Sequence, residues 1–272
     1  FSSPDSSWRV FASDPSKRAA EQFFLGYAVV WLGVFVPVVA LEHYKQYRDW
    51  EYNLLAVFVA LPNFLIPLLF PFKADVGTPV TQRFYFLANV WIAILTFVGN
   101  YFWTHYFYTV LGASYSFPVT WMLNDVPIML YLITHGYFIF YHTLTTIALR
   151  LYYQTRFANW LNTALLVFVL AVFTAFMETW TISNVPYYSH RDKFEMYTIG
   201  SVFYGIYFYV SFPMYYRIHE ERVVTNHWTW TRAALDSLAA CMLVTILLDF
   251  WRLIVSHSSL AKGLPWLANF GK

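Results

Sequence analysis

The sequence has few charged residues and a single cysteine, and both shortages exclude classes of protein. Aspartate, glutamate, lysine and arginine make up 12% of the 272 residues, whereas a soluble domain carries about 25%. The chain therefore has too few charged residues to cover the surface of a soluble protein, and the 59% hydrophobic content excludes a disordered chain. The net charge of +2 is too small to indicate a nucleic-acid-binding protein. Cys241 alone can form neither an intrachain disulfide nor a site with several cysteine ligands.

Several signatures of membrane enzymes and receptors are also missing. The eight histidines include no HxxxH or HExxH pair, which argues against a diiron enzyme or a membrane zinc protease, and no metal is predicted. The last apolar segment contains no lysine to attach retinal, and no glycine-rich phosphate loop is present. No ladder of arginines suggests voltage sensing.

Long apolar segments dominate what the chain does contain. An α-helix needs about 20 apolar residues to cross a bilayer, and seven segments qualify, at 20–41, 52–71, 84–107, 126–149, 160–182, 197–217 and 233–255. Pro62, Pro67 and Pro71 predict a kink in the second of them. The predicted fold is an all-α, polytopic bundle of about seven transmembrane helices, with residues 1–272 as a single membrane-embedded domain. Ten of the 17 lysines and arginines fall on the N-terminal side, which favours a cytoplasmic N-terminus.

Polar residues inside these segments are candidate site residues, because ionisable groups are costly within a bilayer. A helix rises about 1.5 Å per residue, so the depth of each residue follows from its distance to the segment end. Segments three, five and seven run in the same direction. We therefore expect one polar layer in a single leaflet, formed by His105, Asn100, Glu178 and Asp249, with His135 close to it.

Two carboxyl groups in this layer have different surroundings in the sequence. Glu178 has no basic residue within one helical turn, so the neutral form is favoured and the group could act as a general acid. The alternative is a hydrogen-bonded glutamate between packed helices. Asp249 has Arg252 three residues on, which would keep it ionised as a base or simply form an ion pair at the membrane interface. His105 could relay a proton, whereas His135 is equally well explained by packing.

Aromatic residues reach 22% of the chain, more than interface belts usually require. The surplus suggests an interior lined by rings, which could bind a lipid-like substrate and stabilise a cation. The candidate rings are Tyr101, Trp103, Trp180, Tyr204 and Tyr207. Ordinary helix packing is the alternative for each of them.

Several runs of the sequence are familiar. In chain order, these runs are 14–18 (DPSKR), 99–107 (GNYFWTHYF), 111–115 (LGASY), 140–142 (FYH), 184–188 (NVPYY), 203–214 (FYGIYFYVSFPM) and 243–252 (LVTILLDFWR). Together they closely resemble the cycloeucalenol cycloisomerases, a family of cyclopropyl sterol isomerases, over residues 14–267. Asn100, His105, Glu178 and Asp249 lie within the part of the chain that resembles the family.

The resemblance implies an activity. The family opens the 9β,19-cyclopropane ring of cycloeucalenol to give obtusifoliol, in sterol synthesis at the endoplasmic reticulum membrane and without a cofactor. Its partners are then the cyclopropyl sterol and the surrounding membrane lipid. Two other functions remain open: a membrane protein that binds or transports sterols without catalysis, and a multi-spanning receptor or transporter.

Overall fold

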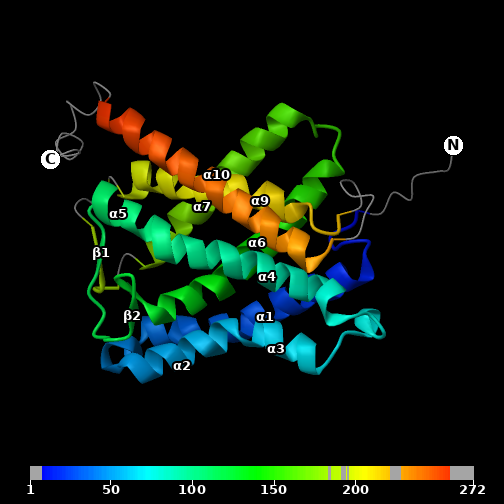
Figure 1. Cartoon of the computed structure of the whole chain (residues 1–272), viewed down its shortest axis with the longest axis horizontal. Coiled ribbons are helices and arrows are strands. Elements are labelled where there is room, and N and C mark those ends of the chain that lie inside the picture. The colour runs from blue at the N-terminus through cyan, green and yellow to red at the C-terminus, as the bar shows by residue number, and fades with distance from the viewer. Residues whose placement is uncertain (1–7, 183–184, 191–193, 195, 221–227, 258–272) are drawn as a thin grey trace.

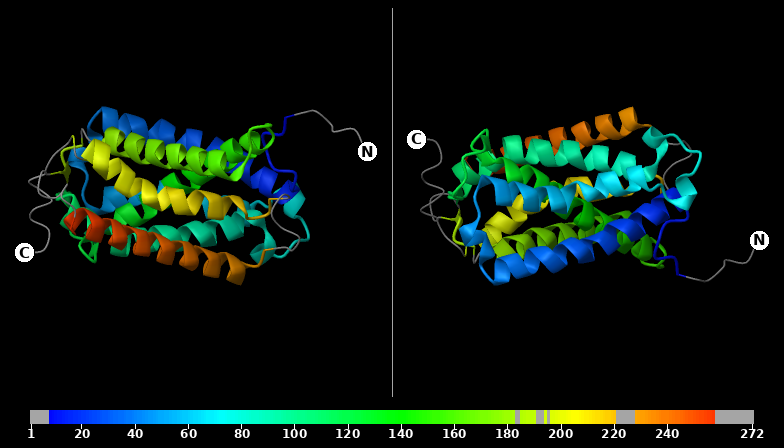
Figure 2. Two further views of the ribbon diagram at one scale, coloured as in Figure 1. Left: turned by 90° about the horizontal axis from the view of Figure 1, so that it is seen from above. Right: turned by 90° about the horizontal axis from the view of Figure 1, so that it is seen from below.

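The computed structural model describes residues 8–182, 185–190, 194, 196–220 and 228–257. They form an elongated bundle whose helices run along its long axis (Figures 1 and 2). The α-helices are α1 (Pro15–Ala40), α2 (Asp49–Ala60), α3 (Pro62–Leu69), α4 (Phe84–Val98), α5 (Thr104–Val110), α6 (Ile128–Tyr153), α7 (Trp160–Ile182), α9 (Ser201–Tyr216) and α10 (Trp230–His257). Each of the seven predicted segments coincides with one of these helices or with a consecutive pair.

Strands are confined to one end of the bundle. β1 (Ser114–Tyr115) pairs antiparallel with β4 (Tyr188–Ser189), and β2 (Met122–Leu123) pairs antiparallel with β3 (Val126–Pro127). Each strand has only two residues. The prediction of an all-α fold is therefore confirmed for the described part of the chain.

The number of membrane spans is confirmed only in part. Within the described residues, four helical stretches are long and apolar enough to cross a membrane, at Pro15–Ala40, Phe84–Val110, Trp160–Ile182 and Trp230–Leu253. The pair α2 and α3 makes a fifth if its halves are taken together. They bend by 51°, as expected where Pro62 interrupts the helical hydrogen bonds. Helices α6 and α9 do not meet the same test.

The central position of α6 explains its polarity. It packs against α1, α2, α4 and α9, so a large part of its surface meets protein rather than lipid. Helix α7 packs mainly against α9, and α10 packs against α4 and α9 (Figure 1). A helix enclosed in this way can carry threonines, histidines and an arginine without exposing them to hydrocarbon.

Helices α2 and α6 approach each other closely at Gly136. A Cβ atom built on Gly136 would lie 2.9 Å from the carbonyl oxygen of Val59 and would overlap the Val59 side chain. Helices α2 and α6 can therefore pack at this distance because glycine has no side chain.

A buried ionic network joins α1, α6 and the segment that follows α9, at the opposite end from the strands. Arg150 of α6 donates to Glu21 of α1 at 2.6 Å and to Glu220 at 2.9 Å. Lys17 of α1 donates to Glu220 at 2.9 Å and to the carbonyl oxygen of Ile218 at 2.6 Å. Burial opposes ionisation of Glu220, but Arg150 and Lys17 outweigh it and lower the pKa of this carboxyl. The two positive and two negative charges cancel within a few ångströms.

Removing one member should destabilise the fold strongly. Arg150→Met leaves Glu21 and Glu220 buried with only Lys17 between them, and an uncompensated buried charge costs about 3–5 kcal/mol. Thermal unfolding of the purified protein in detergent measures the loss. Lys45→Ala is the control, since its pair with Glu42 is about half exposed and should contribute about 0–1 kcal/mol. Equal losses in the two variants would contradict a structural role for the network.

Adding one methyl group at Gly136 should separate α2 from α6. Gly136→Ala forces overlap with Val59, and overpacking of this kind costs about 1–3 kcal/mol. Gly26→Ala is the matched control, because nothing lies within 4 Å of a Cβ there and alanine stabilises a helix by about 0.5–1 kcal/mol relative to glycine. In the same thermal assay, Gly136→Ala should lower the unfolding temperature and Gly26→Ala should raise it. A Gly136→Ala variant as stable as the wild type would rule out the tight contact.

Candidate active site

A cavity of about 600 Å³ lies at the end of the bundle that carries the strands. Its wall is formed by α1, α2, α6, α7, α9, the junction of α4 with α5, and strands β1 and β4. The volume falls within the range of about 300–1,000 Å³ typical of sites for small organic ligands. Most of its lining is apolar or aromatic, which suits a hydrophobic ligand.

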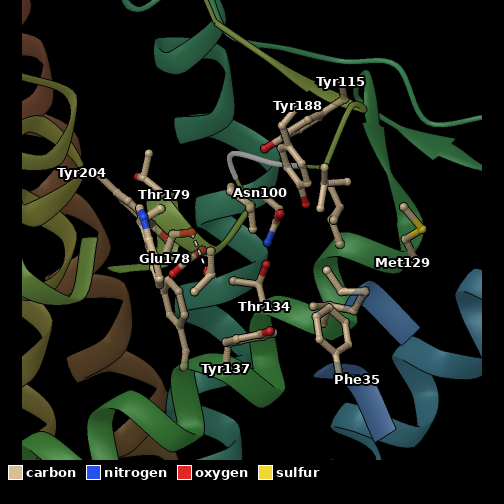
Figure 3. A pocket seen from close by; sticks show the side chains of 18 of the residues that line it. Phe35, Asn100, Tyr115, Met129, Thr134, Tyr137, Glu178, Thr179, Tyr188 and Tyr204 are labelled. Carbon is tan, nitrogen blue, oxygen red and sulfur yellow. Dashed lines mark hydrogen bonds between the residues drawn. The ribbon is translucent and has the colours of Figure 1, made fainter. Parts of the chain in front are cut away.

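Glu178 is the only acidic side chain among the described residues that line this cavity. No lysine or arginine lines it there, and His190 is the one histidine among the described lining residues. Glu178 sits near the C-terminal end of α7 and points toward the cavity, with Thr179 and Tyr204 beside it (Figure 3). The described lining therefore places no lysine or arginine beside the Glu178 carboxyl.

Two phenols flank the Glu178 carboxyl. The hydroxyl groups of Tyr141 on α6 and Tyr204 on α9 lie close enough to interact with it. Its Oε2 atom is nevertheless buried without a well-formed hydrogen bond to any described residue. One oxygen of the carboxyl therefore remains available to a ligand in the cavity.

A local change of helix type brings Asn100 to the cavity. Residues Gly99–Trp103 form a π-helical turn between α4 and α5, and such turns often occur at functional sites. Asn100 lines the cavity, as expected, and its Nδ2 atom donates to the Thr96 carbonyl oxygen at 2.9 Å. The amide oxygen is left for other partners.

The strand end of the cavity is closed by tyrosines that sequence reasoning did not single out. Tyr115 of β1 and Tyr188 of β4 meet edge to face, with ring centroids 5.3 Å apart. Burial raises the pKa of both phenols above the ordinary value, so both remain neutral. Thr134 and Tyr137 of α6 add further hydroxyl groups to the lining (Figure 3). Tyr115 and Tyr188 end two of the runs that resemble the family, but nothing in the sequence shows that β1 pairs with β4 and brings the two rings together.

Two predicted catalytic residues lie outside the cavity. Asp249 of α10 forms an ion pair with Arg252 at 2.7 Å, and about 40% of each side chain is exposed. His105 of α5 contacts the carbonyl oxygen of Asn124 at 3.2 Å instead of the cavity. Neither lines the cavity with Glu178: Asp249 lies on α10, which packs on α4 and α9, and His105 faces the loop that contains Asn124.

The other predicted binding residues divide in the same way. Trp180, Tyr204 and Tyr207 line the cavity. Tyr101, Trp103 and His135 do not, and each has another role. The ring of Tyr101 stacks on Phe97, Trp103 donates to Thr245 at 2.8 Å, and His135 meets Asn89 at 2.9 Å. These contacts are the ordinary packing roles that the sequence left open.

Side chains of α1 and α7 that line the cavity are also exposed on the outside of the bundle, and from this we infer an opening between the two helices. Val36 of α1 and Trp180 of α7 both line it, and each is also 55% exposed. Both helices carry mostly outward-facing apolar side chains. The opening therefore faces the surroundings of the bundle that an apolar ligand would occupy.

The described residues contain no cluster of three histidine, cysteine, aspartate or glutamate side chains able to hold a metal ion. His105 and His135 in particular have separate partners, Asn124 and Asn89.

Comparisons with known proteins identify the family. No family model and no solved structure matches the chain. It is, however, 43% identical over 282 aligned residues to the cycloeucalenol cycloisomerase of Arabidopsis thaliana. The alignment covers 98% of this chain and 99% of the relative. At this identity, over nearly the full length of both proteins, the chain belongs to the cycloeucalenol cycloisomerase family.

Proposed function

We propose that this protein is an integral membrane isomerase that opens the 9β,19-cyclopropane ring of a cyclopropyl sterol, converting cycloeucalenol to obtusifoliol. The observation that carries the proposal is one carboxyl group, Glu178, in an apolar and aromatic cavity that opens between two outward-facing apolar helices. The name of the Arabidopsis relative supports the substrate.

The reaction requires an acid more than any other group. A cyclopropane is a very weak base, so its protonation needs an undissociated acid held in place and away from water. Glu178 meets this requirement, because a carboxyl without a nearby cation in an apolar site favours its neutral form. Its proton adds to C19, and the electrons of the C9–C19 bond form the new C–H bond. Loss of the C8 proton then gives the Δ8 double bond, and no electrons are gained or lost overall.

Aromatic rings around Glu178 serve the charged stage of the reaction. Positive charge develops at C9 when the ring opens, and the faces of electron-rich rings attract a cation. Tyr141, Tyr204 and Tyr207 surround the carboxyl and line the cavity. The same apolar lining excludes water, which would otherwise add to the cation.

The proposed active site contains fewer residues than the polar layer that was expected from the depth of each residue along its helix. Asp249 and His105 have no part in it, because they lie outside the cavity. Asn100 and the tyrosines of β1 and β4 provide the polar groups available to the sterol hydroxyl.

The membrane arrangement extends the same proposal. Helices α6 and α9 cross the bilayer inside the ring of more apolar helices, which gives seven spans in one catalytic domain. The N-terminus is cytoplasmic, and the protein resides in the endoplasmic reticulum, where sterol substrates are available. The packing of α6 against four other helices supports its position at the centre.

Conversion of the sterol distinguishes this function from simple sterol binding or transport. Purified protein incubated with cycloeucalenol should yield the Δ8 product, detected by gas chromatography and mass spectrometry. A binding or transport protein would return the sterol unchanged.

Replacing the acid should abolish turnover without abolishing binding. Glu178→Gln keeps the size of the side chain but has no acidic proton, so the rate should fall by at least about 10²–10⁴-fold. Product formation in protein that still binds sterol is the measurement. Asp249→Asn is the control, since this carboxyl is outside the cavity, and it should retain most of the activity. Normal turnover by Glu178→Gln would eliminate Glu178 as the proton donor.

A bulky side chain at the mouth of the cavity should hinder entry of the sterol. Val36→Trp narrows the opening between α1 and α7 and should lower kcat/KM about tenfold, equivalent to about 1.4 kcal/mol. Val30→Trp is the matched control: Val30 lies on the same helix with 53% exposure but does not line the cavity. Equal kinetics for the two variants would show that substrate enters elsewhere.

A further inference from the structure

The described lining of the cavity supplies one carboxyl group, where a separate carboxyl acid and carboxyl base would need two. Ring opening delivers one proton to C19 and removes another from C8, which ordinarily calls for a separate acid and base. Glu178 is the only carboxyl among the described lining residues, and the expected base, Asp249, is paired with Arg252 elsewhere. This inference rests on the proposed function and concerns where the C8 proton goes.

The geometry of the substrate allows one group to reach both positions. C19 and C8 are both bonded to C9, so they lie about 2.5 Å apart, as atoms two bonds apart do. The cyclopropane methylene and the C8 hydrogen project from the same β face of the sterol. The two oxygens of a carboxyl group are separated by about 2.2 Å. A carboxyl placed over this face therefore meets C19 with one oxygen and the C8 hydrogen with the other.

The surroundings of Glu178 suit both halves of the reaction. After donating its proton, the group is a carboxylate in a cavity where no described lysine or arginine can compensate it. Such an ion is strongly disfavoured, so it recaptures a proton from any donor within reach. The hydrogen on C8 lies next to the cationic C9, so it is far more acidic than the phenols of Tyr141 and Tyr204 and is the one that the carboxylate takes. The phenols of Tyr141 and Tyr204 hold the carboxyl without supplying positive charge.

We propose that Glu178 is both the acid and the base of the reaction. One oxygen gives its proton to C19 as the C9–C19 bond breaks, and the C8–H electrons form the C8=C9 double bond. The C8 proton passes to the other oxygen, so the carboxyl ends the turnover protonated and ready for the next sterol. The dry cavity keeps this proton from exchanging fully with water between turnovers.

An isotope label follows this proton directly. The wild-type protein in lipid nanodiscs converts cycloeucalenol carrying deuterium at C8, in ordinary water and over many turnovers. We expect deuterium in the C19 methyl group of product formed after the first turnover, because Glu178 donates to C19 the deuteron that it took from C8 of the previous sterol molecule. The labelled fraction should rise with sterol concentration as the interval between turnovers shortens. Unlabelled product incubated in parallel with protein in deuterated water controls for later exchange at the methyl group.

The outcomes separate this inference from the function on which it rests. Δ8 product without deuterium at C19, even at saturating sterol, would overturn the shuttle and leave the isomerase function intact. If His190→Gln then abolished turnover in protein that still binds sterol, His190 would be the separate base. Absence of Δ8 product from the wild-type protein would instead refute the proposed function. Deuterium at C19 in the wild type, together with inactivity of Glu178→Gln, would establish both roles.

Discussion

Charge buried in this bundle is tolerated only where an opposite charge meets it or a proton neutralises it. At one end, Lys17, Glu21, Arg150 and Glu220 cancel each other and fix α1, α6 and the chain after α9 together. At the other end, Glu178 has no lysine or arginine beside it among the described lining residues, so the cavity favours its neutral, protonated form. The ion pairs hold the ends of the helices rigidly together, whereas the protonated carboxyl group is reactive. The helices between them separate the two environments.

Depth along each helix could be predicted from the sequence, but rotation about the helix axis could not. Counting residues assigned Asn100 and Glu178 to one polar layer, and both side chains line the same cavity. The same count included His105 and Asp249, which point elsewhere. The π-helical turn at Gly99–Trp103 changes the angular position of every residue after it. No periodicity based on 3.6 residues per turn anticipates that change.

The ionic network escaped sequence analysis for a related reason. Lys17 and Arg150 were counted as interfacial charges that set membrane orientation, because both lie near the ends of apolar segments. Their partner Glu220 follows α9 in what reads as an ordinary polar link. Only the folded chain brings residues about 200 positions apart into contact, as in the bond from Lys17 to Glu220. Local signals were more reliable: the kink at Pro62 was correct.

The network also imposes an order on biosynthesis. The ribosome delivers Lys17 and Glu21 first, and on α1 they are four residues apart, so each can compensate the other while the rest of the chain is missing. Arg150 follows after most of the helices, and Glu220 emerges later still. The four charges can therefore adopt their final partners only after α9 has left the ribosome. Truncated chains that stop before residue 220 keep an excess positive charge at this end, which distinguishes an unfinished molecule from a complete one.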